Sequence, residues 1–156
     1  MGRNRGDNLD DTGWRILEEL QKNSRLTFKE IGNRVGLSCS SVAERVRRME
    51  EEGLICGYTA IVDGEKAGFA VQAIVEVKAF SPKDEEALGK KLLDIPSVLQ
   101  CWNITGDNNF VMETAFESVK DLQSFLVSLG EHGQTFSSIV LDILHRKHLQ
   151  EPRRRM

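Results

Sequence analysis

Three arginines, Arg45, Arg47 and Arg48, stand close together in the stretch GLSCSSVAERVRRMEEEGLI, residues 36–55. Each guanidinium presents forked N–H donors that match the edge of a guanine base or a phosphate group. Small hydroxyl side chains precede the arginines and would let a helix approach a groove closely. These residue types favour hydrogen bonding to DNA. The predicted DNA-binding residues are Ser38, Ser40, Ser41, Glu44, Arg45, Arg47 and Arg48.

The same stretch also has a simpler interpretation as a charged helix face without a ligand. Glu44 with Arg48, and Arg47 with Glu51, have the i,i+4 spacing of helix ion pairs. Glu44 itself could accept a hydrogen bond from a cytosine or hold Arg48 in position. The net charge of −3 does not decide between DNA binding and a charged helix face without a ligand, because residues 1–60 hold ten Lys/Arg and ten Asp/Glu. The acidic excess falls in residues 61–156, so a local basic surface remains possible.

The cysteines and histidines do not suggest a metal centre. Cys39, Cys56 and Cys101 are an odd number at wide spacings, which argues against a disulfide framework and a Cys-rich metal site. Cys39 falls in the first turn of the predicted arginine-bearing helix, where free backbone amides favour a reactive thiol. Its oxidation would alter the DNA-facing surface. His145 and His148 lack a Cys or acidic partner at metal-ligand spacing, so we expect no metal and no cofactor.

Two earlier helices must position the arginine-bearing helix. Asp10 or Asp11 can cap a first helix, whose apolar face contains Trp14, Ile16, Leu17 and Leu20. A capping box, Thr27 with Glu30, opens a second helix that ends at Gly36, a residue able to take the left-handed conformation. Ser38 can then cap the third helix. Two helices joined by a short turn around glycine form a helix-turn-helix.

The third helix is predicted over residues 39–52 with two distinct faces. Val42, Val46 and Met49 share a narrow buried sector. The opposite face carries the serines, Glu44 and Arg48, with the other two arginines on its flanks. An extended piece follows at 58–62, and a turn or linker at 63–68 marks the domain boundary.

The second part of the chain alternates between strands and helices. Val71, Ala73, Val75 and Val77 define one face of the first strand. The expected strands are 69–80, 97–105, 110–116 and 136–146. The expected helices are 82–95, opened by Ser81-Pro82, and 119–130, capped by Ser118. The order βαββαβ is the ferredoxin-like pattern.

Helices of such a fold cover only one face of the sheet. The remaining positions still offer Ile74, Leu99, Val140 and Leu144. An uncovered, partly apolar sheet face indicates a partner, and the simplest partner is a second copy of the chain.

Several local motifs occur together along residues 9–146. They are Leu9-Asp10 before Ile16-Leu17, Asn23-Ser24-Arg25-Leu26, GLSCSSVAERVRRMEEEGLI, Tyr58-Thr59-Ala60, Lys66-Ala67-Gly68 and Thr105-Gly106-Asp107. This combination resembles the leucine-responsive / asparagine-synthesis regulator (Lrp/AsnC) family. The resemblance implies an α+β chain with an N-terminal winged helix-turn-helix domain, a linker strand and a C-terminal ferredoxin-like βαββαβ domain. It also implies a sequence-specific DNA-binding transcription regulator that dimerises through its sheet and assembles into octamers.

The family resemblance further implies that a small effector, commonly an amino acid, binds near the hairpin turn at contacts between dimers. The effector-binding residues carried over in this way are Gly106, Asp107, Asn108, Asn109 and Ser137. This chain departs from the usual T-G-x-Y-D-Y, because Asn108 replaces the tyrosine and neutral Asn109 replaces the acid. Ser137 stands where the family often has threonine. The departures leave two readings open: good turn chemistry alone, or a changed or lost effector.

The sequence predicts four regions: a disordered N-terminus (1–8), the DNA-binding domain with its linker strand (9–62), the oligomerisation and effector domain (69–146), and a tail (147–156). No apolar run is long enough to span a membrane and no signal peptide is recognisable, so a cytoplasmic protein is expected.

An enzyme is the alternative, because siroheme decarboxylases of haem biosynthesis look like this family. Their chemistry depends on histidine and on aromatic and basic residues in the second half, whereas residues 97–116 contain no His, Arg or Tyr. No paired-carboxylate, Ser-His-Asp or Cys-His arrangement is persuasive either, so no catalytic residue is predicted.

Overall fold

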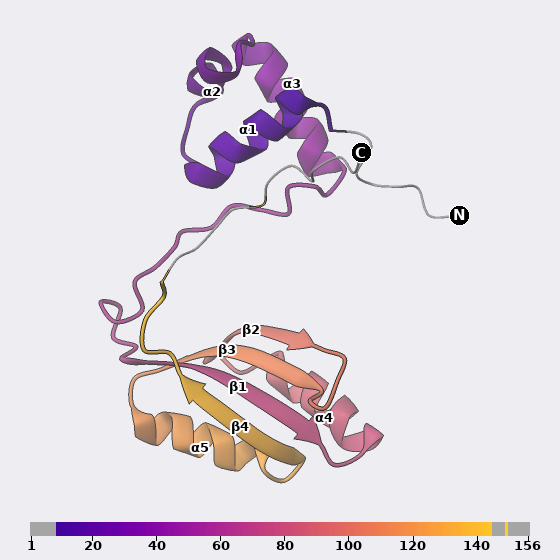
Figure 1. The fold of residues 1–156 in the computed structure, drawn as a ribbon, viewed down its shortest axis with the longest axis vertical. Coiled ribbons are helices and arrows are strands. Elements are labelled where there is room, and N and C mark those ends of the chain that lie inside the picture. The colour runs from indigo at the N-terminus through magenta and orange to yellow at the C-terminus, as the bar shows by residue number, and fades with distance from the viewer. Residues whose placement is uncertain (1–8, 145–148, 150–156) are drawn as a thin grey trace. The chain divides into compact units, whose positions relative to one another are not determined.

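The computed structural model describes residues 9–144 and residue 149 (Figure 1). The predicted disordered N-terminus, the end of the last predicted strand and nearly all of the tail lie outside these residues. Residues 9–60 and 61–144 belong to two separate compact units, and each unit is described by itself.

The first unit consists of three helices, each of which begins at the predicted cap. They are α1 (Asp11–Lys22), α2 (Phe28–Val35) and α3 (Cys39–Glu51). The side chains of Asp10, Thr27 and Ser38 accept backbone N–H groups in the first turns, and Thr27 with Glu30 completes the capping box. The core between the helices contains Ile16, Leu20, Ile31, Val35, Val42 and Val46.

The turn between α2 and α3 depends on two glycines. Gly36 ends α2 in the left-handed conformation, with φ of +79°. The amides of Gly36 and Leu37 both donate to the carbonyl of Gly32, at 2.8 and 2.9 Å. A Cβ atom on Gly32 would lie 2.5 Å from the Leu37 carbonyl oxygen, so only glycine permits this close turn.

The predicted linker strand has no neighbouring strand in the described part of the chain. Residues 55–63 are not assigned to any sheet, because a strand requires a partner for its ladder of hydrogen bonds. Tyr58 donates its hydroxyl to Glu50 at 2.8 Å, which ties the start of the linker to α3. Partial burial and this hydrogen bond raise the pKa of Tyr58 to about 12.

The second unit has the predicted βαββαβ order. Its elements are β1 (Val71–Ala79), α4 (Pro82–Leu92), β2 (Val98–Asn103), β3 (Phe110–Phe116), α5 (Val119–Leu129) and β4 (Gly133–Ile139). The strands form one antiparallel sheet in the order β2-β3-β1-β4. The ferredoxin-like topology is therefore confirmed.

The last strand begins earlier and ends earlier than the apolar pattern predicted. β4 pairs with β1 from Gly133 opposite Ala79 to Ile139 opposite Ala73. Val140 donates one further hydrogen bond, to Gln72, and β1 itself begins at Val71. The apolar run 140–144 therefore has no ladder left to join, whatever its β propensity.

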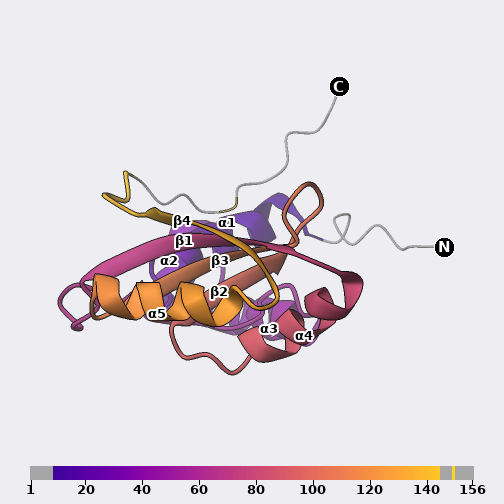
Figure 2. The same ribbon diagram turned by 90° about the horizontal axis from the view of Figure 1, so that it is seen from below.

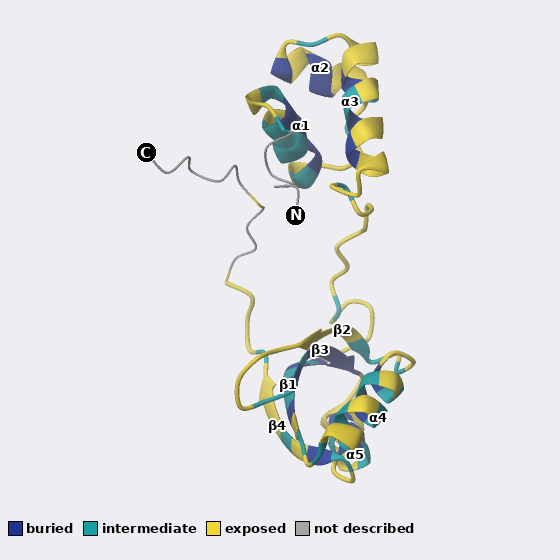
Figure 3. Ribbon diagram, turned by 90° about the vertical axis from the view of Figure 1, so that its right-hand side faces the viewer, coloured by how far each residue is buried: buried dark blue, intermediate teal, exposed yellow. Residues whose placement is uncertain are grey.

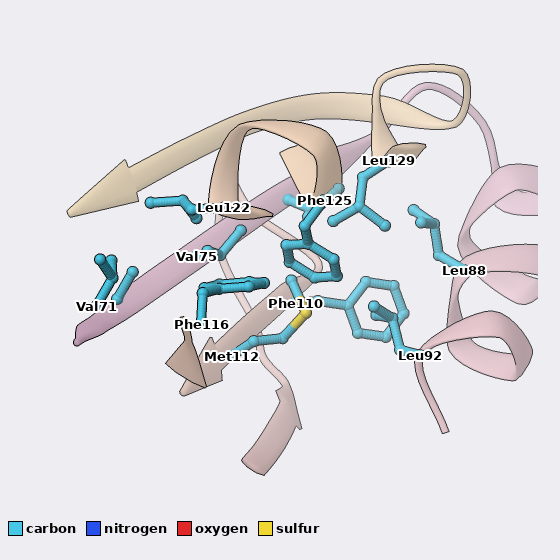
Figure 4. Close-up of a cluster of buried hydrophobic side chains, with 12 residues drawn as sticks. Val71, Val75, Leu88, Leu92, Phe110, Met112, Phe116, Leu122, Phe125 and Leu129 are labelled. Carbon is cyan, nitrogen blue, oxygen red and sulfur yellow. The ribbon is translucent and has the colours of Figure 1, made fainter. Parts of the chain in front are cut away.

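Both helices of the second unit lie on the same side of the sheet (Figures 2 and 3). Val71, Ala73, Val75 and Val77 face these helices and are buried, as the alternation in sequence predicted. Figure 4 shows the aromatic, Leu and Met side chains that pack against them from α4, α5 and β3. The principal contributors are Leu88, Leu92, Phe110, Met112, Phe116, Leu122, Phe125 and Leu129.

No helix of the described residues covers the opposite side of the sheet, which is here called the open face. In the strand register, Trp102 pairs with Val111, Val111 with Glu76, and Glu76 with Phe136. This row crosses all four strands and is apolar except for Glu76. Trp102 and Phe136 are 41% and 48% exposed.

Of the four residues expected on the uncovered side, only Ile74 lies in a regular row of the open face, opposite Glu113 and Ser138. Leu99 falls at an irregularity of β2, and Val140 and Leu144 lie beyond the end of β4.

Candidate DNA-binding surface and ligand turn

The exposed face of α3 begins with three serines. Ser38 is the helix cap: its hydroxyl accepts the Ser41 N–H at 3.2 Å and lies 3.0 and 2.8 Å from the hydroxyls of Ser40 and Ser41. Ser40 and Ser41 are exposed, whereas Val42 on the opposite face is buried. The first turn of α3 therefore presents only small side chains, the serines and Cys39, to the outside.

Arg47 and Arg48 follow on the same exposed surface, and each is paired with acids of α3. Arg47 contacts Glu51 at 2.6 Å and Glu44 at 2.9 Å, and Arg48 contacts Glu52 at 2.8 Å. Glu44 therefore pairs with Arg47 and forms no ion pair with Arg48, unlike the expected i,i+4 pair. The Arg47–Glu51 pair is confirmed.

These ion pairs are weak enough to be exchanged for contacts with DNA. The Arg47 and Arg48 side chains are 58% and 64% exposed. Exposed ion pairs of this kind contribute little to stability, since water already solvates both charges. A phosphate or a guanine edge can therefore replace the carboxylate at little cost.

Arg45 has a different position from the other two arginines. Its two terminal nitrogens bind both carboxylate oxygens of Asp10, at 2.8 and 3.0 Å. The Arg45 hydrogen bond, followed by that from the Gly13 amide, lowers the pKa of Asp10. Because Asp10 also caps α1, this contact fastens α1 to α3 and gives Arg45 a structural role within the helical unit.

Arg15 is a residue that the sequence pattern did not single out. It donates to the carbonyls of Arg34 at 2.8 Å and of Val35 at 3.4 Å, at the end of α2. A cation there satisfies free carbonyls and complements the helix dipole just before the turn. The contact spans about twenty residues, so no local spacing could reveal it.

The hairpin turn between β2 and β3 is held to the rest of the second unit mainly by Asn109. Its side-chain oxygen accepts the Ala79 N–H at 2.8 Å, and its side-chain nitrogen donates to Glu85 at 3.0 Å. Its backbone N–H donates to Val77 at 2.8 Å. Both ends of the amide therefore bind the protein, and Asn109 acts as a structural fastening for the turn.

A second carboxylate also binds the turn: the side-chain nitrogen of Asn108 donates to Glu76 of β1. Glu85 of α4 also accepts the Asn103 amide, at 3.2 Å. The neighbouring Asp107 is exposed and has no hydrogen-bond partner among the described residues. The turn itself lacks the acid of the family motif, but Glu76 of β1 and Glu85 of α4 lie next to it in the fold. Both acids are too far from the turn in sequence for a local motif to reveal them.

Ser137 is not brought next to the turn within one chain. Ser137 lies on β4 and pairs with Val75 of β1, whose side chain faces the helices. Glu76 and Asn108, by contrast, meet on the open face. A cleft of about 480 Å³ lies at another edge of the unit, lined by Phe69, Phe116 and Phe125 among others. None of the five predicted effector residues lines it.

The other side chains with metal-binding or nucleophilic chemistry are the acids, cysteines and histidines. No group of three or more His, Cys, Asp or Glu side chains gathers as a metal site there. The three cysteines are free and exposed, Cys39 among them. His132 contacts Asp84 at 3.3 Å, and Ser81 followed by His132 lowers the pKa of Asp84. His145 and His148 lie outside the described residues.

Among the described helices, none has both the length and the apolar character needed to cross a bilayer.

Two family models match the chain. Residues 9–55 match a winged helix-turn-helix DNA-binding model, and residues 72–149 match the Lrp/AsnC ligand binding domain. An uncharacterised HTH-type transcriptional regulator of Bacillus subtilis, YezC, is 38% identical over 133 residues, covering 85% of this chain and 94% of its own. The HTH-type regulator LrpC of the same species is 32% identical over 140 residues, covering 90% and 96%.

Solved structures show the same similarity in three dimensions. The structure of B. subtilis LrpC superimposes with a TM-score of 0.83 at 32% identity, covering 89% of this chain and 99% of that one. The regulator NMB0573 of Neisseria meningitidis, solved as a complex with L-methionine, gives a TM-score of 0.81 at 30% identity, covering 92% and 96%. A feast or famine regulatory protein of Mycobacterium tuberculosis, also complexed with L-methionine, gives 0.81 at 28%, covering 92% and 99%.

Proposed function

Because the chain belongs to the Lrp/AsnC family of transcriptional regulators, we propose that it reads specific DNA sites through α3 and responds to a small amino-acid-like effector at the hairpin turn. DNA binding is assigned to residues 9–62, and assembly and effector binding to residues 69–146. The observation that carries the proposal is the exposed face of α3, where two loosely paired arginines follow small hydroxyl side chains.

The mechanism begins with the first turn of α3 in a major groove. Ser40 and Ser41 are small enough to allow close approach, and Ser38 keeps the helix start formed by capping it. Arg47 and Arg48 then exchange carboxylates of α3 for phosphates or guanine edges. Arg45 contributes by holding α1 against α3, so that the helix-turn-helix enters as one rigid unit.

Two copies are required to read a site in this way. A dimer would present two α3 helices to successive major grooves, and the symmetry of the operator would mirror that of the protein. The open face supports this part of the proposal, because its apolar side chains Trp102 and Phe136 remain well exposed in the described part of the chain. Larger assemblies, up to an octamer, would be built from such dimers.

The effector part of the proposal rests on the family and on two relatives solved with L-methionine. In this chain, Gly106, Asp107 and Asn108 are the turn residues available to a ligand. Asn109 is committed to Ala79 and Glu85. Ser137 would join the site only from another chain, since it lies away from its own turn.

The decisive test of the DNA-binding surface is Arg48→Ala. The Arg48 ion pair is exposed, so the fold should stay intact while affinity for the preferred site falls by about tenfold, as for one lost base contact. One base preference should also relax. The matched control is Lys90→Ala, which removes an equally exposed i,i+4 ion pair with Glu86 in the second unit.

The measurement is a gel-shift titration at fixed salt, on a site first obtained by in vitro selection. Fixed salt matters because phosphate contacts make affinity strongly salt-dependent. Equal affinity of the Arg48→Ala variant and the wild type would contradict the proposed surface.

A further inference from the structure

We propose that the C-terminal residues are an accessory DNA-binding arm: Gln21 of α1 holds their backbone at Leu149, and Arg153, Arg154 and Arg155 bind phosphates beside the site that α3 reads. The inference rests on the DNA-binding part of the proposed function and adds an interaction surface to it. The three arginines lie outside the described residues, whereas Gln21 and Leu149, which form the anchor, lie within them.

The anchor is a pair of hydrogen bonds between one side chain and one backbone residue. The side-chain nitrogen of Gln21 donates to the Leu149 carbonyl oxygen, and the Leu149 N–H donates to the side-chain oxygen of Gln21, both at 2.9 Å. The amide thus bonds to both backbone groups of one residue, as a neighbouring strand does in a ladder. The Leu149 side chain is 79% exposed, so the backbone and not apolar packing makes the attachment.

This contact attaches the end of the chain to the DNA-binding unit. Gln21 and Leu149 are 128 positions apart, and Leu149 belongs to the same compact unit as residues 9–60. A cationic segment that follows Leu149 therefore stays with the helices that bind DNA, although it comes after the second unit in sequence.

The charges of the chain are distributed so that this attachment matters. Residues 61–144 hold six Lys/Arg and thirteen Asp/Glu, whereas residues 145–156 hold five Lys/Arg and one Asp/Glu. Residues 1–60 are balanced, with ten of each. With the arm attached, the DNA-binding unit carries a net positive charge, which attracts the phosphate backbone of DNA. The formal charge of −3 for the whole chain conceals this separation.

The arginines are close enough to the anchor to reach DNA beside α3. An extended chain advances at most about 3.6 Å per residue, so residues four to six positions beyond Leu149 can lie up to about 14–22 Å from it. α1 packs directly on α3, as the Arg45–Asp10 contact shows, and the axes of packed helices are about 8–10 Å apart. The arm is therefore long enough to cross from α1 to DNA bound at α3.

The end of α1 offers the arginines little competing negative charge. Glu19 is already paired with Lys22 and Arg34. The nearest other acid of this helix is Glu18, which is one carboxylate against three guanidinium groups. Lys22 and Arg25 are exposed here and repel further cations. A phosphate backbone, by contrast, offers many acceptors that match the forked donors of arginine.

The test of the arm is a triple variant of the full-length protein, Arg153→Gln with Arg154→Gln and Arg155→Gln. Each phosphate contact contributes about −0.9 to the slope of log affinity against log salt concentration. The slope should therefore become shallower by about 1 to 3 per chain, and affinity at low salt should fall at least about tenfold. Affinity for the selected site and for an unrelated duplex should fall by similar factors, because phosphates carry no sequence information.

The matched control removes three cations from the second unit: Lys83→Gln, Lys90→Gln and Lys120→Gln together. These lysines are exposed, and the control has the same net charge as the arm variant. Its slope should equal that of the wild type, because the effect depends on where the charges lie. Gel-shift titrations at several salt concentrations measure the slopes, and thermal unfolding confirms that each variant is folded. An unchanged slope in the arm variant, or an equal loss in the control, overturns the arm.

Gln21→Ala tests the anchor. It should weaken DNA binding by about two- to threefold, because the effective concentration of the arginines near the bound DNA falls when their attachment is lost. In the variant without the three arginines, Gln21→Ala should have no further effect, since both changes act through the same arm. Gln123→Ala, at an exposed position of α5, is the matched control. Equal losses from Gln21→Ala with and without the arginines would overturn the anchor.

Failure of this inference and failure of the proposed function are distinguishable. If Arg48→Ala lowers affinity while the arm variant binds DNA like the wild type, the arm is wrong and sequence reading by α3 stands. If the wild type prefers no DNA site but the arm variant still loses salt dependence, sequence reading falls and the arm stands as a phosphate-binding segment.

Discussion

Asn109 differs from an aspartate by one side-chain nitrogen in place of an oxygen, and this difference changes which groups the turn can bind. An asparagine has both a donor and an acceptor, and here the Ala79 amide uses the acceptor and the Glu85 carboxylate uses the donor. An aspartate at this position could still accept from Ala79 but would bring a second negative charge against Glu85. A neutral Asn109 is therefore compatible with Glu85, whereas an aspartate is not, and the Asn109–Glu85 hydrogen bond holds the turn to α4.

A double-mutant cycle tests this pairing. Asn109→Asp should lower the free energy of unfolding by about 1–3 kcal/mol, because it replaces a hydrogen bond with two facing acids. Adding Glu85→Gln should restore most of the loss, since a glutamine can donate to Asp and still accept the Asn103 amide. Urea unfolding followed by circular dichroism measures the four corners of the cycle.

Asp107→Asn is the matched control in the same turn. It makes an equal change of charge at an exposed residue without a hydrogen-bond partner among the described residues, so it should not alter stability. Strictly additive effects of the Asn109 and Glu85 changes would show that the two side chains are not coupled.

At the scale of the element, the first residue of each helix could be predicted from sequence, because helix capping depends on residues within one turn. Asp10, Thr27, Ser38, Ser81 and Ser118 each accept an amide of the first turn, as the spacing of polar residues predicted. The end of β4 could not be found in this way, because a strand continues only as far as its partner does.

The turn of the helix-turn-helix offers a prediction at this scale. Gly32→Ala should destabilise the first unit by about 1–3 kcal/mol, because the new methyl group would overlap the Leu37 carbonyl, which belongs to the backbone. Gly89→Ala in α4 is the matched change: its Cβ would lie 3.8 Å from the Phe110 ring, an ordinary contact. It should stabilise α4 by up to about 1 kcal/mol through helix propensity.

Hydrogen–deuterium exchange separates the two effects, since peptides from α2 and from α4 report on different units. Gly32→Ala should accelerate exchange in α2 and α3 and leave α4 unchanged. Equal protection of α2 in wild type and Gly32→Ala would mean that the turn relaxes to accept the methyl group.

At the scale of the whole molecule, the open face of the sheet is the surface that we propose for assembly. One side of the sheet is buried by α4 and α5, and the other exposes a row of apolar side chains around Glu76. Burying such a surface against a second copy removes apolar area from water, which favours a two-fold symmetric dimer.

Trp102→Lys tests the assembly. A charge in this row should weaken dimerisation by at least about tenfold, because it must be desolvated or left at a broken interface. Val127→Lys is the control, since Val127 is 70% exposed on α5, away from the open face. Light scattering across a dilution series gives the mass of each variant. Unchanged assembly of Trp102→Lys would rule out the open face as the dimer surface.

The sequence by itself determined the helix caps, the glycine turn, the alternating strand β1 and the order of elements, because these depend on residues one to four positions apart. It also indicated the arginine-bearing face of α3. Only the tertiary structure decided which acids meet which bases and amides. Arg45 binds Asp10, Asn108 binds Glu76 and Asn109 binds Glu85, across separations of 24 to 35 residues. Such contacts depend on strand register and helix packing, which many distant residues set together.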